Sequence, residues 1–322
     1  MALSGRVKIV VPGDEPTQIG GSSHLEKLTP FGDVVLYETR PQSADEKIER
    51  AQGADVIMNT RGAVTWGEEE FSQLPDLKLI ATCSIGTDMI DLDAARKHGV
   101  VICNQPGRTA PVVAEHMFGL MFAISKRAAF VTAQMKAGQW PRLDNVMLQG
   151  KTLGIVGTGN IGAEMARLAR AIGMDVVAWT FNPSPERGEA LGVRFVELNE
   201  LLDTADVVSL HVALSDDTRG MIGKSELERM KTGSLLLNGA RGAVVDTEAL
   251  VDALNSGHLG GAGIDVYEEE PPPADLALLQ CEQVVLTPHC ADMTPEGVDL
   301  LNSGAVENVI AFLEGRTQNI VT

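Results

Sequence analysis

The sequence predicts an α/β protein with two doubly wound domains. Short β-branched strands alternate with helical segments along almost the whole chain, a pattern typical of parallel sheets with helical crossovers. The 322 residues also exceed what one hydrophobic core usually covers. A long apolar helix interrupts the alternation once, and the alternation resumes after it. We therefore expect one sheet before this helix and a second sheet after it.

The first sheet is expected from five short apolar runs separated by helices. The predicted strands are residues 7–11, 34–37, 54–58, 77–81 and 100–102. Helical segments are expected around Leu25, over residues 46–52 and after Asp91. This order, strand then helix, favours a parallel arrangement throughout the first domain.

The interrupting helix is predicted from Thr109 to about Arg127 and is rich in Met and Ala. A helix that is apolar on most of its surface must be buried, either in a core or against a second subunit. The strands expected beyond it are residues 153–156, 174–179, 207–211, 234–238, 263–266 and 284–287. The last helix should run from Pro295 to Leu313 and end at Gly315. We expect it to return to the first domain and complete it, since few residues precede the interrupting helix.

A glycine-rich turn follows the first strand of the second domain. It reads Gly157-Thr158-Gly159-Asn160-Ile161-Gly162, which is the spacing of a dinucleotide-binding loop. The first glycine permits a tight turn, the second lets a pyrophosphate approach the backbone, and the third lets helix and strand pack closely. The helix N-terminus then offers unpaired N–H groups to the phosphates. An ordinary strand-to-helix turn is the alternative, and the strand and helix on either side favour the nucleotide site.

The composition argues against several classes of partner. The formal net charge is −18, which disfavours nucleic acids and anionic membrane surfaces, since both need a basic footprint. No apolar run approaches the roughly 20 residues that cross a bilayer, and the N-terminus has no signal-peptide core. The four cysteines show no C-x-x-C spacing. We therefore expect reduced thiols, no metal site and a cytoplasmic location.

Three polar side chains each follow a predicted strand of the second sheet, namely Arg241, Glu270 and His289. In open α/β sheets, ligands bind at the carboxyl ends of the strands. An arginine can bind an anion, a carboxylate can orient and charge a histidine, and the histidine can move a proton. Taken singly, such residues are more often a surface ion pair, a solvated turn and a structural histidine. Their joint placement is consistent with a hydride-transfer site and leaves these structural alternatives open.

Several motifs that occur in one order give the chain a resemblance to a known family. They are Gly86-Thr87-Asp88-Met89-Ile90-Asp91, Asn104-Gln105-Pro106-Gly107, Val113-Ala114-Glu115-His116, the glycine turn, residues 238–246, residues 265–271 and Pro288-His289. Nearly the whole chain resembles the D-isomer-specific 2-hydroxyacid dehydrogenases, which include D-3-phosphoglycerate dehydrogenase, D-lactate dehydrogenase and glyoxylate/hydroxypyruvate reductases. Together with the order of elements, this implies a Rossmann dinucleotide-binding domain over residues 104–291. It would be inserted into a smaller, flavodoxin-like substrate domain of residues 1–103 and 292–322.

The resemblance implies an oxidoreductase that uses NAD or NADP and acts between a 2-keto acid and a D-2-hydroxy acid. Arg241 would hold the substrate carboxylate, Glu270 would pair with the histidine, and His289 would be the acid/base. The implied cofactor contacts are Gly157, Gly159, Asn160, Ile161, Gly162, Thr180, His211, Ala240 and Asp265. The first domain would contribute substrate contacts from Arg61, Ser84, Ile85 and Gly86. His116 lies within a motif but is expected to be structural.

One departure from the family pattern concerns the cofactor. NAD-specific relatives carry an acid at the end of the second strand of the cofactor domain, where this chain has Thr180. Such an acid bonds the ribose hydroxyls and repels a 2′-phosphate. We expect both cofactors to work, with a preference for NADP if Arg187 folds back over the adenosine. If Arg187 points to solvent instead, we expect a weak preference for NAD.

The sequence leaves other functions of this fold open. Corepressors that resemble the family bind NAD(H) without catalysis, and formate or phosphite oxidation is a second alternative. The substrate should be a small anionic acid whose side chain is recognised by loops around Arg61, Ser84 and Trp66. A homodimer is expected through the helix from Thr109 to Arg127 and the segment that reaches Trp140, because so apolar a helix is hard to bury within one small domain.

Overall fold

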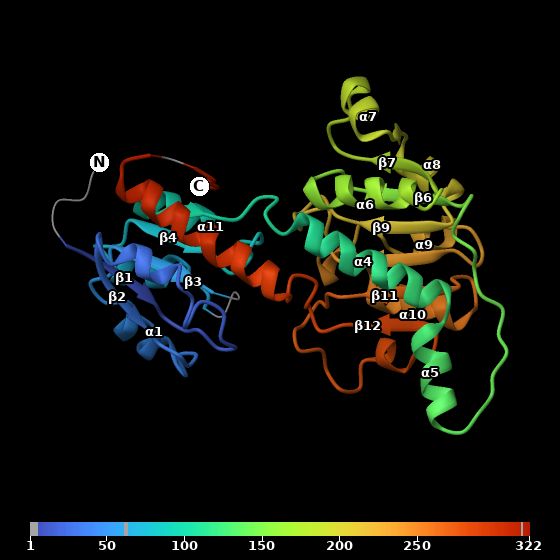
Figure 1. Ribbon diagram of the computed structural model, residues 1–322, viewed down its shortest axis with the longest axis horizontal. Helices are drawn as coiled ribbons and strands as arrows, with labels where there is room; N and C mark the ends of the chain where they lie inside the picture. The colour runs from blue at the N-terminus through green and yellow to red at the C-terminus, as the bar shows by residue number, and fades with distance from the viewer. Residues whose placement is uncertain (1–5, 61–63, 317) are drawn as a thin grey trace. The chain divides into compact units, whose positions relative to one another are not determined.

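The computed structural model describes residues 6–60, 64–316 and 318–322, so Arg61 lies outside the described residues. The chain forms two compact units. Unit 1 comprises Met1–Thr109 with Thr294–Thr322, and unit 2 comprises Ala110–Met293. Each unit has its own parallel sheet with helices packed on it (Figure 1). The predicted α/β class with two doubly wound sheets is confirmed.

Unit 1 contains a five-stranded parallel sheet in the order β2-β1-β3-β4-β5. Its strands are β1 (Val7–Val11), β2 (Gly32–Leu36), β3 (Val56–Asn59), β4 (Leu79–Thr82) and β5 (Val101–Cys103). Every residue of β3 and β4 is buried. Strands that are covered on both faces need apolar side chains at successive positions, which explains the unbroken apolar runs in the sequence.

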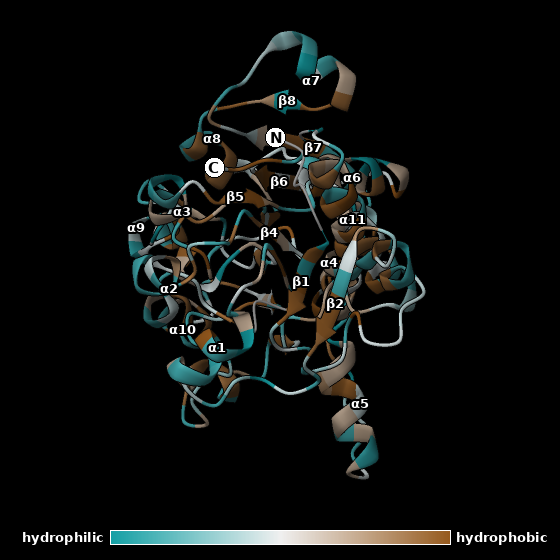
Figure 2. Ribbon diagram, turned by 90° about the vertical axis from the view of Figure 1, so that its left-hand side faces the viewer, coloured by the Kyte–Doolittle hydropathy of each residue, from teal (hydrophilic) through white to brown (hydrophobic). Residues whose placement is uncertain are grey.

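Two hydrophobic cores lie on opposite faces of the unit 1 sheet. Val10 belongs to the core beneath α1 (Ala44–Ala51), α2 (Glu68–Gln73) and α3 (Leu92–His98). Its neighbours Ile9 and Val11 belong to the core beneath α11 (Pro295–Leu313) and the short 3₁₀ helix η1 (Leu25–Leu28). Successive side chains of a strand point to opposite faces, so the alternation assigns one core to each face. Figure 2 shows β1 in the hydrophobic colour and α1 largely in the hydrophilic one.

Unit 2 contains a seven-stranded parallel sheet in the order β12-β11-β10-β9-β6-β7-β8. Its strands are β6 (Thr152–Val156), β7 (Asp175–Trp179), β8 (Arg194–Phe195), β9 (Val207–Leu210), β10 (Leu235–Asn238), β11 (Gly261–Ile264) and β12 (Val284–Leu286). The chain runs outward from β6 to β8 and then returns to β9 on the other side of β6. The order of strands therefore reverses between β6 and β9, and α/β sheets bind ligands at such a switch point.

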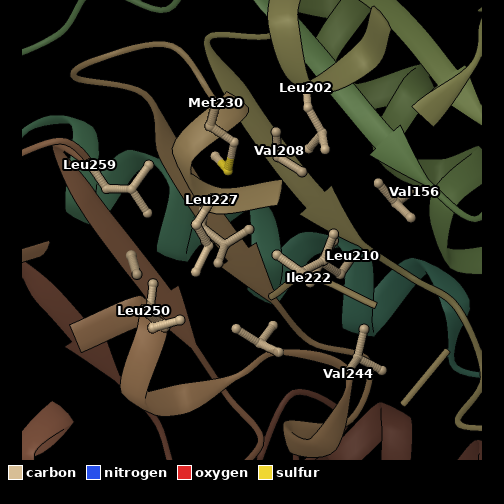
Figure 3. Close-up of a cluster of buried hydrophobic side chains, with 14 of the residues drawn as sticks. Val156, Leu202, Val208, Leu210, Ile222, Leu227, Met230, Val244, Leu250 and Leu259 are labelled. Atoms are coloured by element: carbon tan, nitrogen blue, oxygen red, sulfur yellow. The ribbon is translucent and has the colours of Figure 1, made fainter. Parts of the chain in front are cut away.

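The unit 2 sheet is also covered on both faces. Leu235 and Leu237 pack beneath α4 (Ala110–Ser125) and α6 (Asn160–Ala171), whereas Leu236 packs beneath the helices of the other face. Those helices are α8 (Leu198–Thr204), α9 (Lys224–Arg229) and α10 (Thr247–Asn255), and the remaining short ones are α7 (Pro185–Leu191), η2 (Gly242–Val244) and η3 (Ala277–Gln280). Figure 3 shows the core on this other face, the one that contains Leu236. In it, Val156 and Leu210 lie at the carboxyl ends of β6 and β9. This packing fixes the strand ends from which the glycine turn starts.

The apolar helix expected from Thr109 to Arg127 is α4 (Ala110–Ser125), and a second helix follows it directly. Arg127 has a φ of 50°, a left-handed conformation that separates α4 from α5 (Ala128–Lys136). Eight residues of α4, including Met117 and Met121, are buried within unit 2, whereas Phe122 is 36% exposed. Helix α5 has no buried residue. In the described part of the chain, no helix is long and apolar enough to span a membrane.

Candidate active site

The glycine turn after β6 has the shape that a pyrophosphate site needs. Gly157 has a φ of +95°, and a Cβ there would lie 2.8 Å from the carbonyl carbon of His211. A Cβ on Gly162 would lie 2.2 Å from the carbonyl oxygen of Gly157. A Cβ on Gly159, in contrast, would meet nothing within 4 Å. Close packing therefore requires the first and third glycines, and the second leaves open space over the backbone.

The N-terminus of α6 is available to an anion. Its N-cap residue is Gly159, which has no side chain to bond the first N–H groups, and its first turn contains no acid. The exposed N–H groups and the positive end of the helix dipole favour a phosphate here. The hydroxyl of Thr158 is buried and has no hydrogen-bond partner among the described residues. A buried unsatisfied hydroxyl is costly, and a phosphate oxygen is an acceptor that can satisfy it. The turn thus fits a dinucleotide.

Three more of the expected cofactor contacts follow strands on the two sides of β6 in the same sheet. Thr180 follows β7 and is half-buried. His211 follows β9, its Nε2 lies 2.8 Å from Ser209 Oγ, and its Nδ1 is buried without a partner among the described residues. Burial lowers the pKa of His211 to about 4, so this ring is neutral at physiological pH. Ala240 follows β10 and is buried, and its carbonyl accepts a 2.7 Å hydrogen bond from Arg241 Nη1.

The loops that carry Arg241 and Glu270 touch one another. A Cβ on Gly242 would lie 2.0 Å from the carbonyl carbon of Tyr267, so only glycine allows the two backbones to approach this closely. The amide of Asn238 donates to the carbonyl of Arg241 at 3.0 Å, which holds the arginine against the end of β10. This packing brings the cation and the acidic loop together.

Glu270 and His289 form an ion pair at the ends of β11 and β12. Nδ1 of His289 lies 2.7 Å from Glu270 Oε2, and Glu270 Oε1 accepts a 3.0 Å bond from the N–H of Tyr267. His289 has a φ of 49°, a conformation that non-glycine residues seldom adopt outside functional sites. The side chain of His289 is 47% exposed and that of Glu270 is 37% exposed. With Nδ1 bound to Glu270, Nε2 is left to exchange a proton with a substrate.

The charges of the site act on the pKa values of this pair. The hydrogen bond to Glu270 raises the pKa of His289, and this effect outweighs burial and the charge of Arg241, which both lower it. Burial raises the pKa of Glu270, but the bonds from His289 and Tyr267 and the charge of Arg241 together hold it below its ordinary value. The arginine therefore lies near enough to influence both partners. The pair favours a charged imidazole facing a carboxylate.

Asp265 holds the loop that carries His289. Its side chain is 1% exposed, and its Oδ1 accepts bonds from Thr287 Oγ1 at 2.6 Å and from the N–H of Cys290 at 3.0 Å. Its Oδ2 accepts the N–H of Ala291 at 3.1 Å. Nε2 of His116 lies 3.1 Å from Thr287 Oγ1, so this histidine joins the same network. The sequence indicated a cofactor contact at Asp265 but not this anchoring of the loop.

The expected substrate contacts of unit 1 lie in the loop after β4. The hydroxyl of Ser84 donates to the carbonyl of Gly86 at 2.8 Å, and the amide of Asn104 donates to the carbonyl of Ile85 at 2.8 Å. All three loop residues are half-buried. These bonds give the loop a fixed shape.

The side chain of Trp66, around which a recognition loop was expected, lies in a core of unit 1. Its side chain is 1% exposed and packs with Phe71 in a core of unit 1. Its indole N–H points to Asn59 Oδ1 at 3.4 Å. Burial and an internal hydrogen bond hold the Trp66 side chain in the core, so recognition by the loop around it would have to come from its neighbours.

Tyr267 is a site residue to which the sequence gave no role. Its backbone N–H positions Glu270, and its hydroxyl donates to the carbonyl of Thr287 at 3.0 Å. It thereby connects the loop after β11 to the end of β12. The sequence signal that could have identified Tyr267 as a site residue is its place inside the motif at residues 265–271.

Comparison with known proteins points to one family. The family model of the D-isomer specific 2-hydroxyacid dehydrogenase NAD binding domain matches residues 118–291. The chain is 37% identical over 287 residues to a glycerate dehydrogenase of Methylorubrum extorquens, covering 86% of this chain and 88% of that relative. It is 37% identical over 298 residues to a glyoxylate reductase of Korarchaeum cryptofilum, covering 90% of each. A solved glyoxylate reductase from Paecilomyes thermophila superposes with a TM-score of 0.90 at 31% identity, over 99% of both chains.

Proposed function

This chain belongs to the family of D-isomer-specific 2-hydroxyacid dehydrogenases, and on that basis we propose that Arg241, Glu270 and His289 are its catalytic residues. It is an NAD(P)-dependent oxidoreductase that acts between a 2-keto acid and a D-2-hydroxy acid. The observation that carries the residue assignment is the His289–Glu270 pair beside Arg241 at the strand ends of the cofactor-binding sheet.

Each of the three residues has a separate task. Arg241 binds the substrate carboxylate and polarises the neighbouring carbonyl, for which a planar guanidinium is well suited. When bound, the reduced nicotinamide supplies the hydride. His289 donates the proton on Nε2 to the oxygen that becomes the alcohol, and it takes that proton back in the oxidation direction. Glu270 keeps Nδ1 protonated, orients the ring and stabilises its charged form.

The other predicted contacts divide between the two units. In unit 2, Gly159 and the N–H groups of Asn160, Ile161 and Gly162 would hold the pyrophosphate. Asp265 and the chain around Ala240 would face the nicotinamide end, with His211 close to the turn. Unit 2 would then be the cofactor domain and unit 1 the substrate domain, which supplies Arg61 and the loop from Ser84 to Gly86.

The substrate is proposed to be a small 2-keto acid such as glyoxylate or hydroxypyruvate. The names of the glyoxylate reductase and glycerate dehydrogenase relatives support this choice. We further propose a cytoplasmic homodimer without nucleic-acid partners. The four free thiols fit a reducing compartment, and the net charge of −18 opposes binding to nucleic acid.

A panel of substrates tests this function. The purified protein should oxidise NADH or NADPH with at least one of glyoxylate, hydroxypyruvate and pyruvate, and Arg241→Gln should lose most of this activity. A corepressor-like protein would bind the reduced cofactor but stay inactive with every acid. An enzyme for formate or phosphite would instead reduce NAD(P)⁺ with one of those donors. The three relatives described above are a dehydrogenase and two reductases, and none of them supports a corepressor.

A further inference from the structure

The side chain of Arg187 reaches back from helix α7 to the glycine turn. Its Nη2 donates to the backbone carbonyl of Thr158, the second residue of the turn. Its own N–H is held by Ser184 Oγ at 3.2 Å, at the start of α7. The arginine is half-buried. Its guanidinium is therefore fixed at the turn and does not extend into solvent.

This location is the edge of the adenosine site in a Rossmann fold. Strands β6 and β7 are neighbours, and the N–H of Gly157 donates to the carbonyl of Trp179 at 2.8 Å. The glycine turn and the end of β7 therefore lie side by side. In this fold a residue after the second strand contacts the ribose 2′-hydroxyl, and a nearby arginine accommodates a 2′-phosphate. Here the residue after that strand is the neutral Thr180, so no carboxylate at this position repels a phosphate.

The charge of Arg187 is not neutralised by the protein. In the described ranges of the chain, no carboxylate forms an ion pair with it, and the Thr158 carbonyl is the acceptor of its side chain. Two other arginines of unit 2 are paired, because Arg167 bonds Glu164 at 2.8 Å and Arg194 bonds Glu200 at 2.7 Å. A guanidinium has five N–H donors, so Arg187 keeps donors and a full charge for an anionic ligand.

We propose that Arg187, with the hydroxyl of Thr180, binds the 2′-phosphate of NADP(H) and gives this enzyme a preference for NADPH over NADH. This rests on the proposed function, in which the glycine turn binds a dinucleotide. Phosphate and guanidinium form charge-assisted bonds, and the site is formed before the ligand arrives. The neutral end of β7 and the fixed arginine thus act on the same phosphate.

The test measures cofactor binding rather than turnover. NADPH and NADH differ only in the 2′-phosphate, so a difference between their Kd values reports on the site that binds this phosphate. We expect fluorescence titration to give a lower Kd for NADPH. Arg187→Gln should weaken NADPH binding by roughly ten- to a hundredfold, the range for a hydrogen bond to a charged group, and should leave NADH within about threefold. Arg167→Gln removes the same charge from the exposed surface of α6 and should change neither Kd.

A second variant changes the other residue proposed to bind the phosphate, Thr180. Thr180→Asp places a carboxylate at the end of β7 and should weaken NADPH binding while sparing or improving NADH binding. Equal weakening of both cofactors by Arg187→Gln, with an unchanged NADPH:NADH ratio in Thr180→Asp, would mean that Arg187 only supports the turn, and the proposal would be overturned. Tighter binding of NADH by the unmodified protein would overturn it as well. If neither cofactor binds, the dinucleotide site itself is wrong, which is a failure of the proposed function.

Discussion

At the scale of single residues, the proton transfer that we propose for His289 depends on the bond between its Nδ1 and the Glu270 carboxylate. This bond raises the pKa of His289 above its ordinary value. Reduction needs the protonated ring, and its rate should fall as pH rises through that raised pKa. Oxidation needs the neutral ring, and its rate should fall as pH drops through the same range. Rate profiles measured in both directions on one preparation check these opposite trends.

The same bond predicts the effect of Glu270→Gln. Loss of the carboxylate lowers the pKa of His289, so both rate profiles should shift to lower pH. Reduction near neutral pH should slow by roughly a hundredfold, the lower range for general acid catalysis. Glu269→Gln removes a charge from the adjacent exposed position and should leave both profiles in place. Unshifted profiles in Glu270→Gln would contradict the pairing.

The sequence predicted some of these residues and missed the roles of others for a physical reason. Arg241, Glu270 and His289 each follow a strand, and strand ends can be located from apolar runs. The donors to Asp265 come from the far end of β12, more than 20 residues along the chain. Such tertiary contacts leave no local pattern. The burial of Trp66 was missed for the same reason, since its partner Asn59 lies on β3.

At the scale of elements, we predict different effects for alanine at two glycines of the turn, Gly162 and Gly159. Gly162→Ala places a Cβ 2.2 Å from the carbonyl oxygen of Gly157, so we expect a loss of about 1–3 kcal/mol in the free energy of unfolding. Gly159→Ala meets nothing within 4 Å and should change that free energy by less than about 1 kcal/mol. Its methyl group, however, occupies the space proposed for the pyrophosphate, so NADPH binding should weaken strongly. Denaturant unfolding and cofactor titration on both variants separate the two effects, and unimpaired NADPH binding by Gly159→Ala would contradict the assigned role of the turn.

Element boundaries were predictable where the local signals were strong. Helix α11 begins at Pro295 and ends at Leu313 as expected, because Thr294 caps it, Pro295 occupies its first turn and Gly315 follows. Strand β8 has two residues, too few to show a period-2 pattern. The break between α4 and α5 occurs at Arg127, a residue type that does not signal a left-handed conformation.

At the scale of the whole molecule, helix α5 is the main argument for a dimer. It has nine residues and none is buried, and so short a helix is marginal in water without packing. Exposed apolar side chains lie on it and after it, with Met135 49% exposed, Trp140 73% and Met147 64%. Apolar groups collected in one segment are typical of an interface. The proposed contact therefore includes α4, whose Phe122 is 36% exposed, together with α5 and the segment that follows it.

Light scattering tests the dimer. The unmodified protein should have about twice the mass of one chain at micromolar concentration. The double variant Trp140→Arg with Met147→Arg should be a monomer, because two charges would be buried without partners in the interface. Met89→Arg changes an exposed methionine of unit 1 and should remain dimeric. A monomeric unmodified protein would rule the interface out.

Transfer of the label from a deuterated cofactor is the most direct test of the central claim, that the protein passes a hydride from the nicotinamide to a 2-keto acid and makes the D-hydroxy acid. The reaction would use reduced cofactor with deuterium at both C4 positions and hydroxypyruvate or pyruvate, whichever the enzyme accepts. We expect one deuterium at C2 of a product of D configuration, at a rate that His289→Gln lowers by at least about a hundredfold. A product of L configuration, or a D product without deuterium at C2, would contradict the account.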